Sequence, residues 1–145
     1  MPRVLIVEDN RRDAQLMEWA FRLPPPWEVV WVGSGEEALD YFRGRGPHAD
    51  TGLPDLIVLN LRLPGMHGGE VLEEIKRDPS LRKIPVVMWS VCSIQVDIDK
   101  LYGLGAAVYL VKRVRSREER RQALALRRLF DMAHFPCVSR HALET

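Results

Sequence analysis

Five polar side chains at the ends of apolar runs have types and spacing that could do chemistry together. Glu8 and Asp9 follow the first run, and Asn60, Ser90 and Lys112 stand at the ends of later runs. Adjacent carboxylates supply the oxygen ligands that Mg²⁺ prefers, whereas a hydroxyl and an ammonium group bind phosphoryl oxygens. Each residue alone carries little weight, but the set predicts one site for a metal and a phosphoryl group.

The apolar runs predict strands that would bring these side chains together. Most of the runs are unbroken stretches of Val, Ile and Leu, which are typical of parallel strands buried on both faces. The segments between them are long enough for crossover helices, so we expect an α/β fold with a doubly wound, five-stranded parallel sheet. Ligands of such sheets bind outside the carboxyl ends of the strands. The expected strands cover residues 4–7, 29–32, 56–59, 86–89 and 107–111.

Helix-start and helix-stop signals support the same alternation. Ser34 with Glu37, and Ser116 with Glu119, form capping-box patterns before apolar residues. Proline or glycine closes the first, third and fourth helices. Apart from the helix after Ser34, the expected helices cover residues 11–22, 69–77, 94–102 and 116–133.

Length and composition indicate one domain with its own core. The chain has 145 residues, of which 46% are hydrophobic. Two isolated cysteines, Cys92 and Cys137, favour a reducing cytoplasm over a disulfide framework. We expect no signal peptide and no membrane span. The prediction is a cytoplasmic protein with a domain over residues 1–135 and a short tail over residues 136–145.

Charge is distributed unevenly although the net charge is only +1. Residues 1–111 carry 12 Lys or Arg against 16 Asp or Glu, and residues 112–145 carry 9 against 4. A solvated basic helix explains this excess, and a partner-binding surface on the last helix is the alternative. Nucleic-acid binding is disfavoured because no DNA-binding motif follows. An enzyme is disfavoured too, because no His or Cys stands among the strand-end residues as a nucleophile or base.

Four stretches resemble the receiver domain of two-component response regulators. They are VLIVEDN at residues 4–10, PDLIVLNLRLPGMHG at 54–68, IPVVMWS at 84–90 and GAAVYLVK at 105–112. The resemblance covers about residues 3–130 and implies the flavodoxin-like receiver fold with strand order 2-1-3-4-5. The Glu-Asp-Asn start, the long loop at residues 43–54 and the segment at 76–85 further resemble the regulators that partner bacterial phytochrome kinases.

The resemblance also implies a role for the acidic residues and their neighbours. Glu8, Asp9, the Asn60 side chain and the backbone carbonyl of Arg62 stand where the family binds Mg²⁺. Asn60 itself occupies the position of the aspartate that takes phosphate from a kinase phosphohistidine. The implied partner is therefore a sensor histidine kinase, with a bacteriophytochrome as the suggested one, or a downstream signalling protein.

The remaining strand-end residues correspond to the phosphoryl-binding and switch positions of the family. Ser90 and Lys112 stand where the phosphoryl oxygens are bound. Ser90 and Tyr109 form the switch pair, in which the hydroxyl moves toward phosphate and the aromatic ring follows. No catalytic residue is implied beyond this set.

Asn60 is the departure that matters most for function. A carboxylate can attack phosphorus, whereas a neutral amide is a very poor nucleophile, so Asn60 should not accept phosphate. The substitution also removes one negative charge from the metal site, so Mg²⁺ binding is expected to be weakened. We expect a single-domain response regulator in phosphorelay signalling that acts by protein–protein interaction. The alternative is a conventional phosphoacceptor receiver represented here by an Asp-to-Asn blocked variant.

Three further departures favour a natural loss of phosphotransfer. Arg113 follows the family lysine where proline is usual, so the Lys112–Arg113 peptide is expected to be trans. His67 replaces an aspartate at the predicted cap of the third helix, and a solvated loop residue is the alternative reading. Trp89 places a large ring before Ser90, where plain core packing is the simpler interpretation.

A symmetric homodimer through the fourth helix, fifth strand and fifth helix is the expected assembly. The apolar residues of the last helix spread over a wide arc, and the resemblance points to the same face. Asp97 and Asp99 of the fourth helix are the proposed acidic partners of its basic rim. A monomer whose tail at residues 135–138 covers the arc is the alternative. The rim consists of Arg117, Arg120, Arg121, Arg127 and Arg128.

Overall fold

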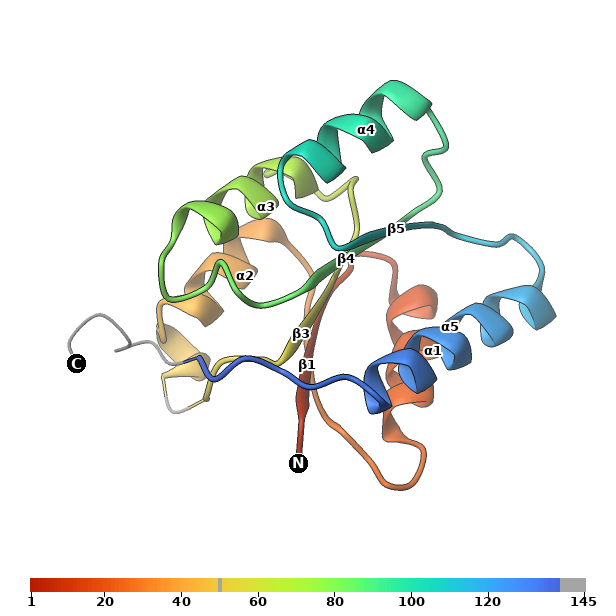
Figure 1. Cartoon of the computed structure of the whole chain (residues 1–145), viewed down its shortest axis with the longest axis horizontal. Helices are drawn as coiled ribbons and strands as arrows, with labels where there is room; N and C mark the ends of the chain where they lie inside the picture. The colour runs from red at the N-terminus through yellow and green to blue at the C-terminus, as the bar shows by residue number, and fades with distance from the viewer. Residues whose placement is uncertain (50, 139–145) are drawn as a thin grey trace.

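The computed structural model describes residues 1–49 and 51–138, and it contains a five-stranded sheet between two layers of helices (Figure 1). The strand order is β2-β1-β3-β4-β5, and all neighbouring strands are parallel. The doubly wound fold and the strand order predicted from the sequence are therefore confirmed. The strands are β1 (Arg3–Val7), β2 (Glu28–Val32), β3 (Leu56–Leu59), β4 (Val86–Ser90) and β5 (Val108–Val111).

The helices divide between the two faces of the sheet (Figure 1). One face carries α1 (Arg11–Arg22) and α5 (Ser116–Asp131). The other carries α2 (Gly35–Phe42), α3 (Gly68–Arg77) and α4 (Gln95–Gly103), and the short 3₁₀ helix η1 (Gly46–His48) follows α2. No helix in the described part of the chain is both long enough and apolar enough to cross a membrane.

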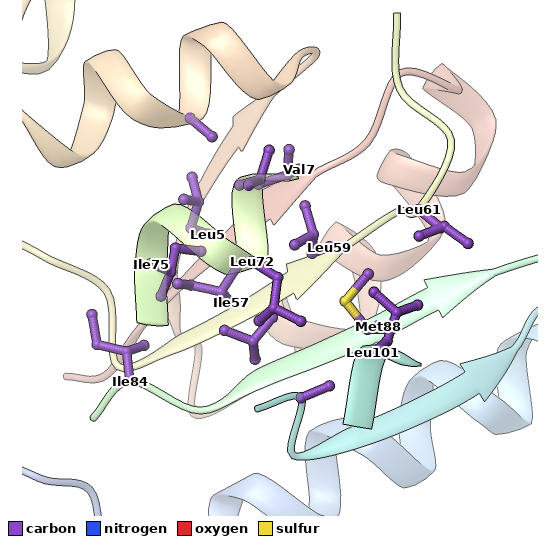
Figure 2. Packing of buried hydrophobic residues seen from close by; sticks show 14 of the residues in the cluster. Leu5, Val7, Ile57, Leu59, Leu61, Leu72, Ile75, Ile84, Met88 and Leu101 are labelled. Atoms are coloured by element: carbon purple, nitrogen blue, oxygen red, sulfur yellow. The ribbon is translucent and has the colours of Figure 1, made fainter. Parts of the chain in front are cut away.

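Alternation of side chains along the strands gives each face its own core. Leu5, Ile57 and Met88 pack on the α2–α3–α4 side, where Leu72 of α3 meets them (Figure 2). Their neighbours in sequence point the opposite way, toward α1 and α5. Every residue of β3 and β4 is buried, whereas the edge strand β2 exposes Glu28 and Trp31, so complete burial applies to the central strands alone.

The helix caps agree with the sequence at α2 and α3 but not at α5. Ser34 Oγ accepts a hydrogen bond from the Glu37 N–H at 3.1 Å, as the capping box predicts. His67 takes the cap position of α3, where its Nδ1 accepts from the Gly69 N–H at 3.1 Å. The predicted cap at Ser116 is wrong, because α5 begins at that residue with Arg115 before it and without a side-chain cap.

Arg127 is a structural residue of the fold and does not belong to the exposed basic rim. Its residue surface is 3% exposed. The guanidinium donates to the backbone carbonyls of Ala20, Leu23 and Pro25 at 2.6–2.9 Å, and Nε donates to Asp131 Oδ1 at 2.7 Å. These bonds satisfy carbonyls at the end of α1 that the helix itself leaves free. The sequence expectation for this arginine was therefore wrong.

The start of the C-terminal tail packs against the core but leaves part of α5 uncovered. The Phe135 ring stacks on Phe130 at 6.2 Å and meets Trp27 edge-on at 5.7 Å. Leu129 and Met132 remain 56% and 82% exposed. Residues 136–138 of the predicted tail are described, and residues 139–145 lie outside the described residues.

Candidate functional site

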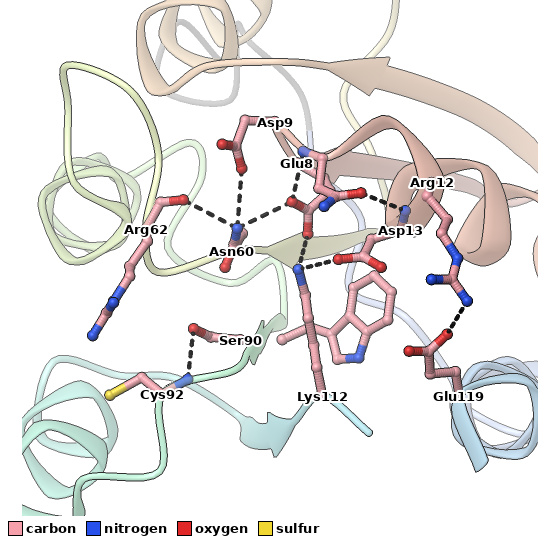
Figure 3. A network of polar contacts seen from close by, with 12 residues as sticks. Glu8, Asp9, Arg12, Asp13, Asn60, Arg62, Ser90, Cys92, Lys112 and Glu119 are labelled. Carbon is pink, nitrogen blue, oxygen red and sulfur yellow. Dashed lines mark hydrogen bonds and ion pairs between the residues drawn. The ribbon is translucent and has the colours of Figure 1, made fainter. Parts of the chain in front are cut away.

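The sheet brings Glu8, Asp9, Asn60, Ser90 and Lys112 to one edge, at the carboxyl ends of β1, β3, β4 and β5 (Figure 3). Backbone hydrogen bonds continue past the strand ends and fix their main chain. The Asn60 N–H donates to the Val7 carbonyl at 3.0 Å, and the Lys112 N–H donates to the Ser90 carbonyl at 2.8 Å. The predicted cluster of strand-end residues is therefore present in space.

The start of α3 lies against this edge because Gly68 has no side chain. A Cβ at Gly68 would lie 2.2 Å from the Asn60 carbonyl oxygen and 2.8 Å from the Leu61 Cα. The Gly68 N–H donates to the Leu61 carbonyl at 2.7 Å. Only glycine allows this approach of backbone to backbone, which closes one side of the site.

The Asn60 side-chain amide is the centre of the acidic part of the site. Its nitrogen, Nδ2, donates to Glu8 Oε2 at 3.0 Å, to Asp9 Oδ1 at 3.2 Å and to the Arg62 carbonyl at 3.1 Å. These three oxygens are three of the four ligands that the family resemblance assigns to Mg²⁺, and the Asn60 side chain is the fourth. Figure 3 shows all three converging on the amide nitrogen. Asn60 is 8% exposed, so the amide lies almost fully within the protein.

Lys112 bonds to two carboxylates and does not bond to Asn60. Its Nζ lies 2.6 Å from Glu8 Oε1 and 2.8 Å from Asp13 Oδ2. It also lies 4.8 Å from the centre of the Trp89 ring, a distance that favours a cation–π contact. Sequence reasoning missed Asp13. The signal was the acidic residue three positions after the helix cap Asn10, whose side chain accepts from the Asp13 N–H at 3.1 Å.

Glu8 is the most deeply buried acid of the site, at 1% exposure. Burial raises the pKa of Glu8 above its usual 4.5, because desolvation disfavours the charged form. The hydrogen bond and the charge of Lys112 oppose this shift, and so does the hydrogen bond from the Asn10 N–H at 3.0 Å. Lys112 and the Asn10 N–H therefore favour the charged form of Glu8 against the cost of its burial.

Ser90 and Tyr109 lie beside each other, as the switch-pair resemblance implies. Ser90 is fully buried, and its Oγ accepts from the Cys92 N–H at 3.3 Å. The Tyr109 hydroxyl donates to the Cys92 carbonyl at 2.7 Å, so the ring points inward. Burial raises the pKa of Tyr109 above its usual 10.0, and a hydrogen bond with Ser90 opposes part of that shift. The two hydroxyls and the main chain of Cys92 thus form one buried network.

Trp89 joins the site to α5. The ring is 1% exposed and packs in the core on the α1–α5 side, as the simpler interpretation proposed. Its Nε1 donates to Gln122 Oε1 at 2.8 Å, and Gln122 Nε2 donates to the Val111 carbonyl at 2.8 Å. Because the same ring lies beneath the Lys112 ammonium, Trp89 is both a core residue and a wall of the site.

The peptide bond after Lys112 has the trans geometry expected from the sequence. Among the described residues the one cis peptide joins Pro24 to Pro25, so the Lys112–Arg113 peptide is trans. Arg113 is exposed and turns away into the loop before α5.

The donor types of the site suit a divalent cation, but their arrangement does not. Mg²⁺ requires oxygens at about 2.0–2.1 Å in near-octahedral geometry. Here the three oxygens lie 3.0–3.2 Å from a nitrogen that stands between them, and that nitrogen carries hydrogens instead of a free electron pair. Among the described residues no group of three or more His, Cys, Asp or Glu is placed to hold a metal ion. The residues present therefore do not fit Mg²⁺ as they are arranged.

Comparison with known proteins gives a consistent family. The family described as "Response regulator receiver domain" matches residues 4–125. The probable methanogenesis regulatory protein FilR2 of Methanothrix harundinacea is 40% identical over 112 residues, covering 75% of this chain and 70% of that protein. Response regulator Rcp1 of Synechocystis is 33% identical over 110 residues, covering 75% of each protein.

A solved structure extends the similarity to the whole fold. The phosphorylated cyanobacterial phytochrome response regulator RcpA has a TM-score of 0.89 and 36% sequence identity, covering 94% of this chain and 99% of that chain. The strand order, the strand-end residues and these matches all lead to one assignment. The chain belongs to the response-regulator receiver family of two-component signalling, and phytochrome response regulators are among its relatives.

Proposed function

We propose that this receiver transmits its signal by protein–protein interaction without accepting phosphate at position 60. The observation that carries the proposal is the Asn60 amide, whose nitrogen donates to Glu8, Asp9 and the Arg62 carbonyl. An amide held in this way has no anionic oxygen with which to attack phosphorus. The state of the protein is then set by what it binds.

The position of Lys112 supports the same proposal. In the role implied by the family, this lysine binds phosphoryl oxygens. Here its side chain is 7% exposed, and its ammonium is neutralised by Glu8 and Asp13 at 2.6 and 2.8 Å. An incoming phosphoryl group would have to compete with two carboxylates for this cation. Ser90 likewise uses its Oγ as an acceptor for the Cys92 N–H.

The competing function is a conventional phosphoacceptor domain in which an aspartate has been replaced by Asn60. The exposed Arg113 after Lys112 and the Trp89 ring under it are the features that favour a natural loss. Both lie beside the site, whereas a blocking substitution requires only position 60. The codon at position 60 in the source genome separates the two possibilities directly.

The proposed partners are a sensor histidine kinase, with a bacteriophytochrome as the specific candidate, or a downstream signalling protein. Similarity to the phytochrome response regulator RcpA supports a kinase of this class. Because the receiver cannot accept phosphate at Asn60, it would bind such a kinase as a competitor of other receivers or as a scaffold. A homodimer through α4, β5 and α5 is the proposed assembly.

The test is phosphate uptake from a small-molecule donor. Incubation with acetyl phosphate and Mg²⁺, followed by intact-mass measurement under mild conditions, should show no added phosphate. The matched variant Asn60→Asp restores a carboxylate at the same position and reports whether the rest of the site still works. A stoichiometric phosphate adduct on the unmodified protein would refute the proposal.

A further inference from the structure

The side-chain amide of Asn60 is placed at the one point that three potential metal ligands share. Glu8 Oε2, Asp9 Oδ1 and the Arg62 carbonyl come from two different segments, the end of β1 and the chain after β3. Each accepts a hydrogen bond from the same nitrogen. The carboxylates of Glu8 and Asp9 repel each other, and the negative end of the Arg62 carbonyl dipole adds to that repulsion. On this side of Glu8 the N–H groups of Asn60 supply the positive end of a dipole between the three oxygens, and Lys112 supplies a charge on the other side.

We propose that the Asn60 amide nitrogen replaces a divalent cation in this receiver, so that the site is assembled by hydrogen bonds and does not require a metal. This inference deepens the proposed function, since it states what holds the site together when neither phosphate nor cation does so. The two N–H donors of the Asn60 amide then take the place of the cation and bond to three oxygen acceptors.

The distances distinguish an amide nitrogen from a magnesium ion at the centre of the three oxygens. Values of 3.0–3.2 Å are normal for N–H···O hydrogen bonds and about 1 Å too long for oxygen ligands of Mg²⁺. A cation could enter only if the amide rotated and presented Oδ1 in place of Nδ2. That rotation would remove all three hydrogen bonds, and of the three oxygens the buried Glu8 Oε2 would keep the bond from the Asn10 N–H.

The charge and the burial of the site favour the Asn60 amide over a cation. Replacing a carboxylate by an amide makes the cluster one unit less negative, which reduces its attraction for a cation. Lys112 already neutralises Glu8 from the other side, at 2.6 Å. Glu8 is 1% exposed and Asn60 is 8% exposed, so the hydrogen bond between them lies in a region of low dielectric constant, where it is stronger than in water. Asp9 and Arg62 lie on the exposed side of the site.

The first experiment reads the hydrogen bonds directly in the full-length protein. The chain contains two asparagines, Asn10 and Asn60, so their side-chain amide signals in a nitrogen–proton NMR spectrum are assigned by single substitutions. The Asn60 NH₂ protons should exchange with solvent at least roughly tenfold more slowly than those of the exposed Asn10. Addition of Mg²⁺ without any phosphate donor should leave the Asn60 signals unchanged.

The second experiment compares the metal response of three proteins. Thermal unfolding is followed with and without Mg²⁺, and Mn²⁺ binding is followed by paramagnetic broadening. The unmodified protein should show neither stabilisation nor binding, and Asn60→Asp should bind at least roughly tenfold more tightly because it restores a charged ligand. Asn60→Ala removes the substitute and leaves the three oxygens, so its metal response should exceed that of the unmodified protein.

The metal affinity of Asn60→Ala, relative to that of the unmodified protein, separates the two models. If the Asn60 carbonyl were a metal ligand, Asn60→Ala would bind more weakly than the unmodified protein, and that result would overturn the inference. Exchange of the Asn60 NH₂ as fast as that of Asn10 would overturn it as well. A stoichiometric phosphate adduct formed with acetyl phosphate would contradict the proposed function, whereas the exchange and metal-binding measurements are made without a phosphate donor, so the two failures can be distinguished.

Discussion

The chemistry of this receiver depends on how a few charged residues are paired at the end of the sheet. Sequence patterns identified Glu8, Asp9, Asn60 and Lys112, because each ends or follows an apolar strand. They did not identify Asp13, which reaches Lys112 through the first turn of α1. Nor did they identify whether the nitrogen or the oxygen of the Asn60 amide points toward the acidic residues, because only the surrounding hydrogen bonds distinguish the two atoms.

Loss of the Lys112 charge should destabilise the fold more than loss of a surface lysine. The variant Lys112→Met leaves Glu8 and Asp13 without a cation, and breaking a buried ion pair in this way costs about 3–5 kcal/mol. Urea unfolding at neutral pH measures the change. Lys83→Met, at an exposed position, should stay within about 0.5 kcal/mol of the unmodified protein.

A double variant tests the cause of that loss. Glu8→Gln combined with Lys112→Met removes the buried carboxylate together with its cation, so the pair should be less destabilised than Lys112→Met alone. A double variant that is less stable than Lys112→Met would show that the hydrogen bonds which the Glu8 carboxylate accepts from Asn10 and Asn60 outweigh the cost of its unpaired charge.

At the scale of elements, the fold was predictable because hydrophobic runs and caps are local signals. The five runs gave all five strands to within one residue at either end, and Ser34 and His67 gave two helix starts. Arg127 was not predictable, since its partners Ala20, Leu23 and Pro25 are more than a hundred residues away in sequence. A long basic side chain on a helix normally faces solvent, and only the packing of α5 on α1 turns this one inward.

The contact between α5 and the end of α1 should give the protein an acid-sensitive component of stability. Burial raises the pKa of Asp131, but the hydrogen bonds from Arg127 and Trp27 and the Arg127 charge outweigh it, so the pKa lies below its usual 3.8. A lowered carboxyl pKa stabilises the fold above the unfolded-state pKa. That contribution is lost as the pH falls through the folded-state value.

The variant Asp131→Asn isolates this component. The difference in unfolding free energy between it and the unmodified protein should be constant above about pH 5 and shrink as the pH falls below about 4. Denaturant unfolding at a series of pH values gives the curve. Glu73→Gln, which removes an exposed carboxylate from α3, controls for the change in net charge. A difference that does not vary with pH would mean that the Arg127 contact contributes by geometry alone.

For the whole molecule, the exposed apolar residues of α4 and α5 are the feature that a monomer leaves unexplained. Val96 and Tyr102 of α4 are 71% and 46% exposed, and Leu129 of α5 is 56% exposed. Leu101 is the one buried residue of α4, and Ile98 packs partly buried against the same core, so most of the helix surface faces outward. Apolar surface rimmed by charge marks an interface.

A symmetric dimer through α4, β5 and α5 accounts for that surface. The rim of α5 that remains after Arg127 is excluded is basic, and Asp99 of α4 is exposed and available to pair with it across a two-fold axis. In such an isologous interface each pair occurs twice, so modest contacts are doubled. Arg120 lies over the Trp19 ring of α1, 5.6 Å from its centre, so the exposed basic residues left for this face are Arg117, Arg121 and Arg128.

Light scattering on a sizing column at tens of micromolar protein decides between dimer and monomer. The expected mass is about twice the 16.7 kDa of one chain, independent of Mg²⁺ and of phosphate donors if Asn60 responds to neither, as proposed. Leu129→Glu places a charge on the exposed face and should return the protein to 16.7 kDa. Gln15→Glu adds the same charge on α1 and should leave the dimer intact. A mass of 16.7 kDa for the unmodified protein, unchanged by salt, would reject the dimer and leave the apolar face of α4 and α5 for a different partner.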